Sequence, residues 1–537
     1  MAEKVMTMAE RVVQLLGDLG VQRLFGMPGG GSNADLIEAA AKLGIPFSLA
    51  HSETASAMMA IAQAEISGKP GACIATLGPG VASIMNGVAQ AFLDRVPLIV
   101  ITDCHPESLR HMQHQSLCQH NLFAPVTKFS AEVRATNVED VLSRAVQSLL
   151  APPPGPVHLD ISGEVTSSMS EGTTACAQAA HLPSSDCDVY RKVQQILGQM
   201  HRPVFFVGLA ARTQEISTGV QQHCESFGIP ALVTYKAKGV APDHHRWFGG
   251  LLTNGALERE VLERADGFIA VGLDPVELLP KVWNYSQPVV SISAWHIDQQ
   301  QVPIAAEIVG DTVELLQKIT AFLPKRSDWS QSEVALLLEA QRAAMRPANI
   351  DGKLTPHRVV EVVAGVYGGS RISVDAGAHM FPVMCLWPAK EPCGVLISNG
   401  LSTMAFALPA AIGACLLNPS QPIVVFTGDG GLLMCLGELR TAARENLPLR
   451  IIVFDDSVLS LIKIKQIKRQ YRTNGVTIGA VNWADLASSM GLLGRTATNE
   501  DELLTCLRET AACAGTVLIA AKISEETYPE TLRALRG

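Results

Sequence analysis

Short apolar runs alternate with amphipathic segments along the first 165 residues of the chain. A helical pattern leads into VQRLF and a Gly-rich turn at 27–31, and helices predicted over 33–43 and 54–67 precede and follow the apolar run IPFSLA. Strands that alternate with helices at this spacing are typical of βαβ units. We therefore predict a parallel, doubly wound sheet that ends with the strand VHLDI.

The same alternation returns twice further along the chain. One later block contains the strands PVFFVG, PALVT and GFIAVG, and another contains RISVD, GVLIS, PIVVFT and LRIIVF, with helices predicted over 403–416 and 434–445. Small and polar stretches separate the blocks and predict linkers. The sequence thus predicts an α/β protein of three doubly wound parallel-sheet domains, with these boundaries: domains 1–165, 186–325 and 351–537, linkers 166–185 and 326–350.

Composition narrows the choice of partners and compartment. A chain of 537 residues suits about three domains, and 47% apolar residues suit buried parallel strands. The net charge of −9 and the lack of any basic run argue against nucleic acid and anionic membranes. No apolar run has the length of a membrane span or the character of a signal peptide. Twelve cysteines without CxxC pairs are expected to be reduced, which predicts a cytoplasmic protein.

The sharpest chemical signal is the GDGG motif that follows the apolar run PIVVFT. It places Asp429 at the carboxyl end of a strand, where open α/β sheets bind ligands. Its glycines, Gly428, Gly430 and Gly431, allow backbone N–H groups to approach an anion closely. Because a lone carboxylate repels phosphate, we expect a cation between Asp429 and the anion.

A second oxygen ligand comes from the next strand, which ends at Asp455-Asp456. Asp456 lies 27 positions after Asp429, so adjacent parallel strands would bring the two carboxylates side by side. Mg²⁺ prefers oxygen ligands such as carboxylates, carbonyls and phosphates. We predict a Mg²⁺ site formed by Asp429, Asp456 and the loop carbonyl of Val458, with the cation anchoring a diphosphate.

From RLFGMPGGG to YRTNGVTIG the chain resembles the thiamine-diphosphate enzymes, and in particular the acetolactate synthases. The family signature is GDG followed, about two dozen residues later, by paired Asn. Here the pair is Asp455-Asp456, and an acidic second position recurs in the catabolic acetolactate synthases. The resemblance implies pyrimidine-binding, central and diphosphate-binding domains, in that order. It also implies a homodimer or homotetramer with active sites between chains, acting on 2-oxo acids or aldehydes.

The resemblance also assigns residues around the cofactor. It makes Glu53 the carboxylate that hydrogen-bonds the aminopyrimidine and so activates thiazolium C2. It makes Met404 the apolar wedge under the bent cofactor, and the Ser402 carbonyl an acceptor for the 4′-amino group. His379 is expected to face the diphosphate, and Pro28 and Gly29 to line the entrance of the site. Taken alone, Glu53 would be interpreted as a helix-start carboxylate; core packing is the alternative for Met404, and a simple turn is the alternative for Pro28 and Gly29.

The substrate side depends on the loop before PVTK. Acetolactate synthases carry Phe-Gln-Glu here; Gln115 matches the Gln, while Ser116 replaces the Glu. Gln115, then His114 and Gln113, are the candidates for moving protons to and from the substrate. A polar surface loop without catalytic function is the alternative.

Several functions remain open at this level. An acetolactate-synthase-like carboligase or decarboxylase is favoured, and a lyase for acyloins or 2-hydroxyacyl-CoA of the same family is the alternative. A catalytically silent assembly protein is a remote third. FAD is not expected, because AVGLDPVELLP lacks the Arg that flavin-binding relatives carry there. An NAD oxidoreductase is disfavoured by the missing dinucleotide fingerprint.

Overall fold

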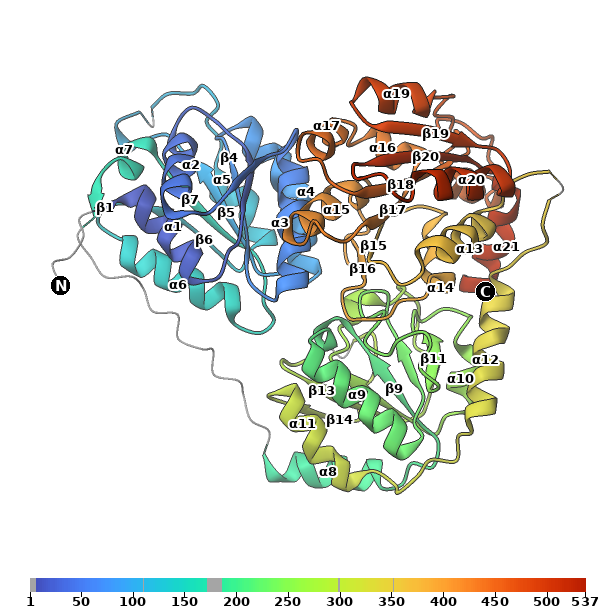
Figure 1. Ribbon diagram of the computed structural model, residues 1–537. Helices are drawn as coiled ribbons and strands as arrows, with labels where there is room; N and C mark the ends of the chain where they lie inside the picture. Colours follow the sequence, from blue (N-terminus) through green and yellow to red (C-terminus); the bar gives the residue numbers. More distant parts are fainter. Residues whose placement is uncertain (1–5, 110, 171–185, 298–299, 351) are drawn as a thin grey trace. The chain divides into compact units, whose positions relative to one another are not determined.

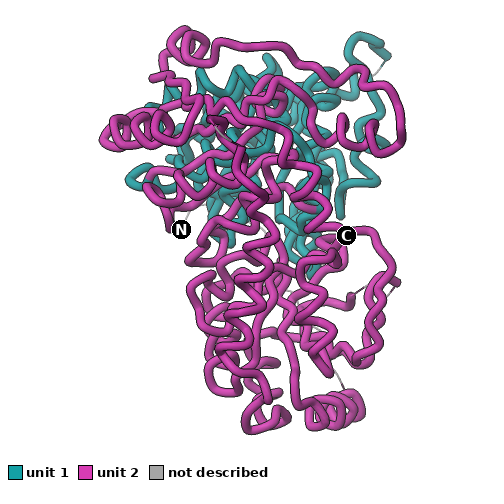
Figure 2. The backbone as a smooth tube through the Cα atoms, turned by 90° about the vertical axis from the view of Figure 1, so that its right-hand side faces the viewer, with its two compact units in different colours: residues 1–181, 400–421, 435–447 teal, residues 182–399, 422–434, 448–537 magenta. Residues whose placement is uncertain are grey.

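The computed structural model describes residues 6–109, 111–170, 186–297, 300–350 and 352–537. The chain divides into two compact units, coloured separately in Figure 2. The first comprises Met1–His181, Gly400–Gln421 and Cys435–Leu447; the second comprises Leu182–Asn399, Pro422–Met434 and Pro448–Gly537. Most of the predicted linker 166–185 lies outside the described residues.

The first sheet has six parallel strands in the order β3-β2-β4-β5-β7-β6, and helices lie on both of its faces (Figure 1). Its strands are β2 (Leu24–Met27), β3 (Phe47–Leu49), β4 (Gly71–Ala75), β5 (Leu98–Asp103), β6 (Phe129–Val133) and β7 (Val157–Ile161). Its helices are α1 (Met8–Asp18), α2 (Ser32–Leu43), α3 (Glu53–Ser67), α4 (Pro79–Leu93), α5 (Gln119–Phe123), α6 (Val138–Leu150) and α7 (Gly163–Thr166). The short strands β1 (Met6–Thr7) and β8 (Met169–Ser170) pair separately.

The first unit also contains two helices from late in the sequence, α15 (Ala407–Leu417) and α17 (Gly437–Arg444). Helix α15 is apolar on every side and packs against α3. The two helices approach so closely that a Cβ on Gly413 would lie 2.2 Å from the Met59 carbonyl oxygen. The Gln63 side chain adds a hydrogen bond of 3.0 Å to the Gly413 carbonyl.

The second sheet has the order β11-β10-β9-β12-β13-β14, again all parallel. Its strands are β9 (Pro203–Val207), β10 (Ala231–Val233), β11 (Phe248–Leu251), β12 (Gly267–Val271), β13 (Val289–Ser293) and β14 (Ala306–Val309). Its helices are α8 (Cys187–Leu197), α9 (Gln214–Phe227), α10 (Arg259–Arg264), α11 (Thr312–Ile319) and α12 (Gln331–Ala344).

The third sheet has the order β16-β15-β17-β18-β20-β19, with every neighbouring pair parallel. Its strands are β15 (Ile372–Val374), β16 (Val395–Ile397), β17 (Ile423–Gly428), β18 (Leu449–Asp455), β19 (Leu493–Ala497) and β20 (Val517–Lys522). The helices of this region are α13 (Pro356–Tyr367), α14 (Met380–Leu386), α16 (Asp429–Leu433), α18 (Ser460–Lys468), α19 (Trp483–Ser489), α20 (Glu500–Thr510) and α21 (Tyr528–Arg536).

Strand order confirms the predicted fold class and shows that the two outer domains are alike. Numbered along the chain within each sheet, the first and third sheets share the order 2-1-3-4-6-5, whereas the central sheet has 3-2-1-4-5-6. In both orders, the strands that follow the first strand are added first on one side of it and then on the other. This change of side opens a crevice at the carboxyl ends of the first strand and its neighbour. Those crevices are where ligands of such sheets are expected.

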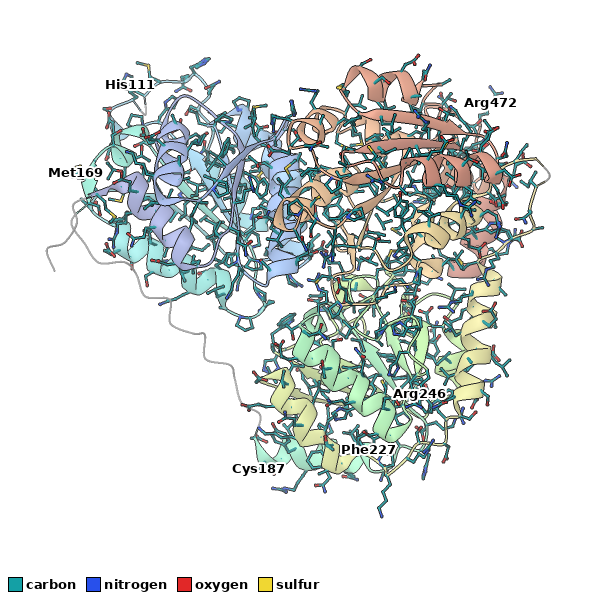
Figure 3. All side chains as sticks on the ribbon, in the orientation of Figure 1. His111, Met169, Cys187, Phe227, Arg246 and Arg472 are labelled. Atoms are coloured by element: carbon teal, nitrogen blue, oxygen red, sulfur yellow. The ribbon has the colours of Figure 1, made fainter. Side chains whose placement is uncertain are left out.

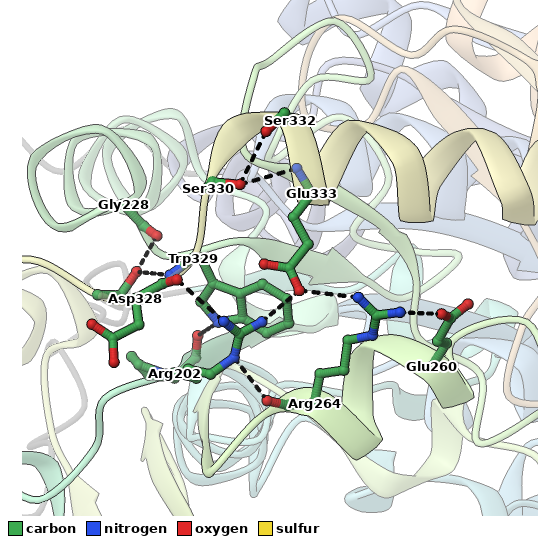
Figure 4. A network of polar contacts seen from close by, with 11 residues as sticks. Arg202, Gly228, Glu260, Arg264, Asp328, Trp329, Ser330, Ser332 and Glu333 are labelled. Atoms are coloured by element: carbon green, nitrogen blue, oxygen red, sulfur yellow. Dashed lines mark hydrogen bonds and ion pairs between the residues drawn. The ribbon is translucent and has the colours of Figure 1, made fainter.

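One predicted linker contains a helix that belongs to the central domain. Within 326–350 the chain forms α12, whose N-terminus is capped by the Ser330 hydroxyl. Figure 4 shows its attachment: Arg202 pairs with Glu333 at 2.7 Å and lies 3.9 Å from the Trp329 ring centroid. Arg264 also reaches Glu333, at 3.1 Å. The segment is therefore fastened to the central sheet and its loops.

The buried apolar side chains are grouped around the sheets. One core lies in the first domain, and a second is continuous through the central and third domains of the second unit. Among the described residues, no helix is long and apolar enough to cross a membrane.

Candidate functional site

The two acidic strand ends of the third sheet lie together, as their spacing predicts. Strands β17 and β18 are parallel neighbours, with Gly428 opposite Phe454. Asp429 begins α16, and one of its carboxylate oxygens accepts the Ser457 N–H at 2.7 Å while the other accepts the Gly430 N–H at 2.7 Å. The loop after β18 is thus bonded directly to the Asp429 carboxylate.

Electrostatics around these carboxylates favour the uptake of positive charge. Burial, and then the charge of Asp456, raise the pKa of Asp429 to about 7. Burial, and to a smaller extent Glu525 and Asp455, raise the pKa of Asp456 to about 6, against hydrogen bonds from Ser460 and Val458. Two close carboxylates in a desolvated place hold protons unless a cation replaces them. A divalent ion with oxygen ligands suits this pair.

The Val458 carbonyl, predicted as a third ligand, lies in the same loop. Its oxygen accepts the Ser460 N–H at 2.9 Å and retains a second lone pair. Ser457, between Asp456 and Val458, has a φ of 60°, a left-handed conformation that non-glycine residues rarely adopt. Such backbone strain occurs preferentially at functional sites.

The glycines of the GDGG motif have steric reasons to be glycine. A Cβ on Gly431 would lie 2.1 Å from a carboxylate oxygen of Asp375, which follows β15. A Cβ on Gly428 would lie 3.2 Å from the His379 ring. Backbone, carboxylate and imidazole therefore crowd the crevice beside β15 and β17.

His379 lies in this crevice with an unused ring nitrogen. The ring is buried and stacks on Phe454 with centroids 5.1 Å apart, and among the described residues Nε2 has no hydrogen-bond partner. Burial lowers the pKa of His379 to about 3, so the ring is neutral until an anion approaches. A buried polar atom without a partner calls for a ligand or water.

Glu53, predicted as the cofactor-activating carboxylate, begins α3. The N-cap is Ser52, whose hydroxyl accepts the Ala55 N–H. The Glu53 side chain is half-buried and points toward the start of α4: a Cβ on Gly80 would lie 3.3 Å from its Oε1. Gly80 thus leaves open the space beside the carboxylate.

The turn before Glu53 is held by α17, a contact that the sequence does not reveal. Glu438, only 2% exposed, accepts the His51 N–H at 2.8 Å and the Thr441 hydroxyl at 2.7 Å. The His51 ring hydrogen-bonds the same hydroxyl at 2.9 Å. Burial raises the pKa of Glu438, and the hydrogen bonds oppose this rise. Glu438 therefore fixes the backbone that leads into Glu53.

The Gly-rich turn after β2 is tightly organised. Pro28 is exposed, and the Gly29 N–H donates to Asn33 at 2.9 Å. A Cβ on Gly29 would lie 2.3 Å from the Thr76 hydroxyl. Two parts of the first crevice, the ends of β2 and β4, meet at this contact.

The loop that carries Gln113, His114 and Gln115 is exposed, and the labelled His111 side chain marks it in Figure 3. The His114 carbonyl hydrogen-bonds the His105 ring at 2.8 Å. Gln115 has a φ of 55° and lies against the first turn of α4, where a Cβ on Gly78 would be 2.8 Å from its Cβ. Of the three candidates, Gln115 is thus the one held next to the turn that leads to Gly80.

Ser402 and Met404 lie in the first unit, in the turn before α15. Ser402 is exposed with a φ of 53°, and Met404 is half-buried. The turn begins at Gly400, whose N–H donates to the buried Asp94 at 2.8 Å. This hydrogen bond joins the turn to the end of α4.

Asp375 and Glu438 are polar residues of these sites that were not predicted. Asp375 is the last residue of the predicted strand RISVD and lies at the same edge as Asp429, so the strand-end argument could have found it. Glu438 offers no such signal, because only the tertiary contact of α17 with the turn at His51 gives it a role.

Comparison with known protein families finds a match in each of the three domains. The N-terminal TPP binding domain of thiamine pyrophosphate enzymes matches residues 6–123, the central domain of these enzymes matches 190–319, and their C-terminal TPP binding domain matches 375–521.

Individual relatives match along nearly their whole length. The chain is 28% identical to an acetolactate synthase of Bacillus subtilis, over 95% of this chain and 92% of the relative. It is 27% identical to a catabolic acetolactate synthase of Raoultella terrigena, over 97% of this chain and 96% of the relative. It is 26% identical to a probable 2-ketoarginine decarboxylase of Pseudomonas aeruginosa, over 96% and 94%.

Proposed function

Because the chain belongs to the thiamine pyrophosphate enzyme family and is an acetolactate-synthase-like enzyme, we propose that it forms or cleaves the C–C bond beside the carbonyl of a 2-oxo acid. The cofactors are thiamine diphosphate and Mg²⁺. The observation that carries the proposal is the pair Asp429 and Asp456, two buried carboxylates at adjacent strand ends whose pKa values burial raises.

The donor set of the third domain fits Mg²⁺ and a diphosphate. Asp429, Asp456 and the Val458 carbonyl would hold the cation through oxygen. The unpartnered Nε2 of His379 and the space kept by Gly428 fit an anion beside it. Neutralisation of the paired carboxylates by the cation removes the repulsion that an isolated diphosphate would meet.

Thiamine diphosphate, when bound, would supply a nucleophilic C2 atom for reaction with the substrate carbonyl. Glu53 would hold a proton on the aminopyrimidine ring nitrogen, and the absence of a side chain at Gly80 leaves the space for it. The Ser402 carbonyl would accept the 4′-amino hydrogen, and the Met404 side chain would pack against the cofactor. Pro28 and Gly29 would border the entrance.

Gln115 is the best placed of the substrate-side candidates, since it lies against Gly78 at the start of α4. Its amide would orient the substrate and relay protons without carrying charge. His114 and Gln113 are exposed in the same loop and would act at its rim. We propose that two chains form the active unit, as homodimer or homotetramer, each supplying Glu53 to the cofactor held by its partner's third domain.

In the central domain, a carboxylate of the chain itself occupies the place where a dinucleotide would bind. At the reversal point of its sheet, Glu277 accepts the Leu209 N–H at 2.8 Å and the Thr234 hydroxyl at 2.5 Å. A Cβ on Gly208 would lie 2.8 Å from the same carboxyl group. Burial raises the pKa of Glu277 to about 8. Because the N–H group that could bind a phosphate already has a partner, we propose that this domain works without FAD.

The deciding experiment incubates the purified chain with thiamine diphosphate, Mg²⁺ and a panel of 2-oxo acids, with and without an aldehyde acceptor, and identifies products by mass. We expect cofactor-dependent release of CO₂ and, with pyruvate, acetolactate. Glu53→Gln should lose turnover by orders of magnitude while retaining cofactor binding. Glu38→Gln, on an exposed face of α2, is the matched control. Normal turnover in Glu53→Gln, or no product from any 2-oxo acid, would refute the proposal.

Decarboxylation without ligation is the second candidate. It is favoured by Ser116, which stands where acetolactate synthases carry Glu, and by the similarity to the probable 2-ketoarginine decarboxylase. An aldehyde as the only product would select it. Cleavage of an aromatic acyloin would instead select the lyase.

A further inference from the structure

A buried group of polar side chains lies between β5, β6 and β7 of the first sheet, apart from the residues assigned above. His158 and Asp160 are two positions apart on β7 and so face the same side. Ser130 of β6 lies opposite His158, and Thr102 of β5 lies opposite Asp160. The short helix α5 adds His120. Three strands and one helix thus converge on one spot.

The geometry of the group suits a metal ion. Ligand atoms of His120, His158 and Asp160 all lie within 4.8 Å of one another. His158 Nε2 and an Asp160 oxygen are 3.1 Å apart. Nitrogen and oxygen atoms bound about 2.0–2.2 Å from a tetrahedral ion lie roughly 3.3–3.6 Å apart. His158 and Asp160 are therefore near that spacing, and a ligand atom of the exposed His120 lies within 4.8 Å of both.

Neighbouring side chains already orient the two buried groups. The Ser130 hydroxyl hydrogen-bonds His158 Nδ1 at 2.8 Å, and His158 Nε2 lies 2.7 Å from the Thr102 hydroxyl oxygen and 3.1 Å from an Asp160 oxygen. Thr102 and the Gln119 amide both donate to the Asp160 carboxylate. Metal-binding histidines and carboxylates are usually held by such second contacts. Burial lowers the pKa of His158, against the attraction of Asp160.

The group opens onto a cavity of about 370 Å³. Asp160 and His120 line it, together with the side chains of Cys104, His105 and Cys118. A three-ligand set facing a cavity leaves a fourth position for water or for a thiolate. Imidazole ligands favour Zn²⁺ and its neighbours over Mg²⁺, which prefers all-oxygen sites.

We propose that His120, His158 and Asp160 bind one first-row divalent transition metal, of which Zn²⁺ is the best fit, at a site separate from the paired carboxylates of the third domain. The ion ties α5 to β7. The exposed loop with Gln115 runs directly into α5, so metal binding holds the base of that loop. A ligand that binds only the folded chain raises its thermal stability.

The test uses the full chain, stripped with chelator and then saturated with Mg²⁺ and thiamine diphosphate. Co²⁺ is titrated as a spectroscopic substitute for Zn²⁺, because four-coordinate Co²⁺ absorbs visible light far more strongly than hydrated Co²⁺. We expect a saturating band at one Co²⁺ per chain, its displacement by Zn²⁺, and a higher melting temperature with Zn²⁺.

Variants separate this site from the other histidines. His120→Gln removes an exposed ligand without disturbing the core and should weaken binding about tenfold or more. His158→Gln should abolish the band, with circular dichroism as the check on folding. His111→Gln, in the neighbouring loop, should bind as the unaltered chain does. No saturable band in the unaltered chain, or equal Co²⁺ affinity in His120→Gln, would overturn the assignment.

Discussion

Replacement of Asp456 by Asn tests the electrostatics of the paired carboxylates directly. In the metal-free chain, burial raises the pKa of Asp429 to about 7 and that of Asp456 to about 6, so protons occupy the site near neutral pH. Metal binding must displace them. We expect log K for Mg²⁺-dependent binding of thiamine diphosphate to fall by about one per pH unit between pH 7 and pH 6, and by about two below that.

Asp456→Asn removes one titrating group and one repulsive neighbour of Asp429. The slope of log K against pH should therefore be smaller by about one below pH 6, or about 1.4 kcal/mol per pH unit. Its onset should also move to lower pH, because the charge of Asp456 is the second largest cause of the raised pKa of Asp429. The ligand's own titration cancels in the difference between the two proteins.

Isothermal titration calorimetry between pH 5 and pH 8 measures these slopes, with circular dichroism as a control for folding. Stability supplies an independent check. Both carboxyls bind protons more tightly in the folded than in the unfolded chain, so the unfolding free energy of the metal-free protein should fall as pH rises from about 4 to about 7. Excess Mg²⁺ should remove that fall. Parallel slopes in the two proteins would refute the reasoning.

Three further predictions concern packing and positioning. Glu438→Gln should lower kcat with little change in cofactor affinity, because the His51 turn loses a charged acceptor and Glu53 loses its fixed orientation. Steady-state kinetics and titration of the cofactor measure the two quantities, and an equal loss of kcat and of cofactor affinity would contradict the prediction. Gly431→Ala should destabilise the chain by about 1–3 kcal/mol in denaturant unfolding, because the new Cβ meets Asp375. Gly365→Ala in α13 places its Cβ within 4 Å of no described atom and should be neutral or stabilising. Arg202→Ala should lower the free energy of unfolding by about 1–3 kcal/mol and detach α12 from the central domain, because it removes the ion pair to Glu333 and the contact with Trp329. Unchanged resistance of α12 to protease would count against this prediction.

The strand pattern was sufficient to predict the three sheets and the meeting of Asp429 with Asp456. Both depend on local rules: apolar runs form buried parallel strands, and consecutive strands joined by a helix are often neighbours. The helix α12 was missed although Ser330 and Glu333 have the spacing of a helix N-terminus. The polar and charged residues before it gave the segment the character of a linker.

Other features depend on contacts between distant parts of the chain. The role of Glu438 arises because α17 packs against the turn at His51, far away in sequence. The cluster around His158 requires the register of β5, β6 and β7, which brings Ser130 and Thr102 beside it. No periodicity specifies that register, so the sequence alone did not predict the cluster.

The left-handed backbone at Gln115, Ser402 and Ser457 has a consequence for engineering. Each conformation costs roughly 1–2 kcal/mol that glycine would not incur. Glycine at any of the three should therefore raise the melting temperature, provided that the added freedom of the unfolded chain does not cancel the gain. A selection for heat resistance alone would favour such changes and would thereby increase the backbone flexibility of three loops that we propose to take part in the reaction. A thermostable version of this chain should be sought at other positions.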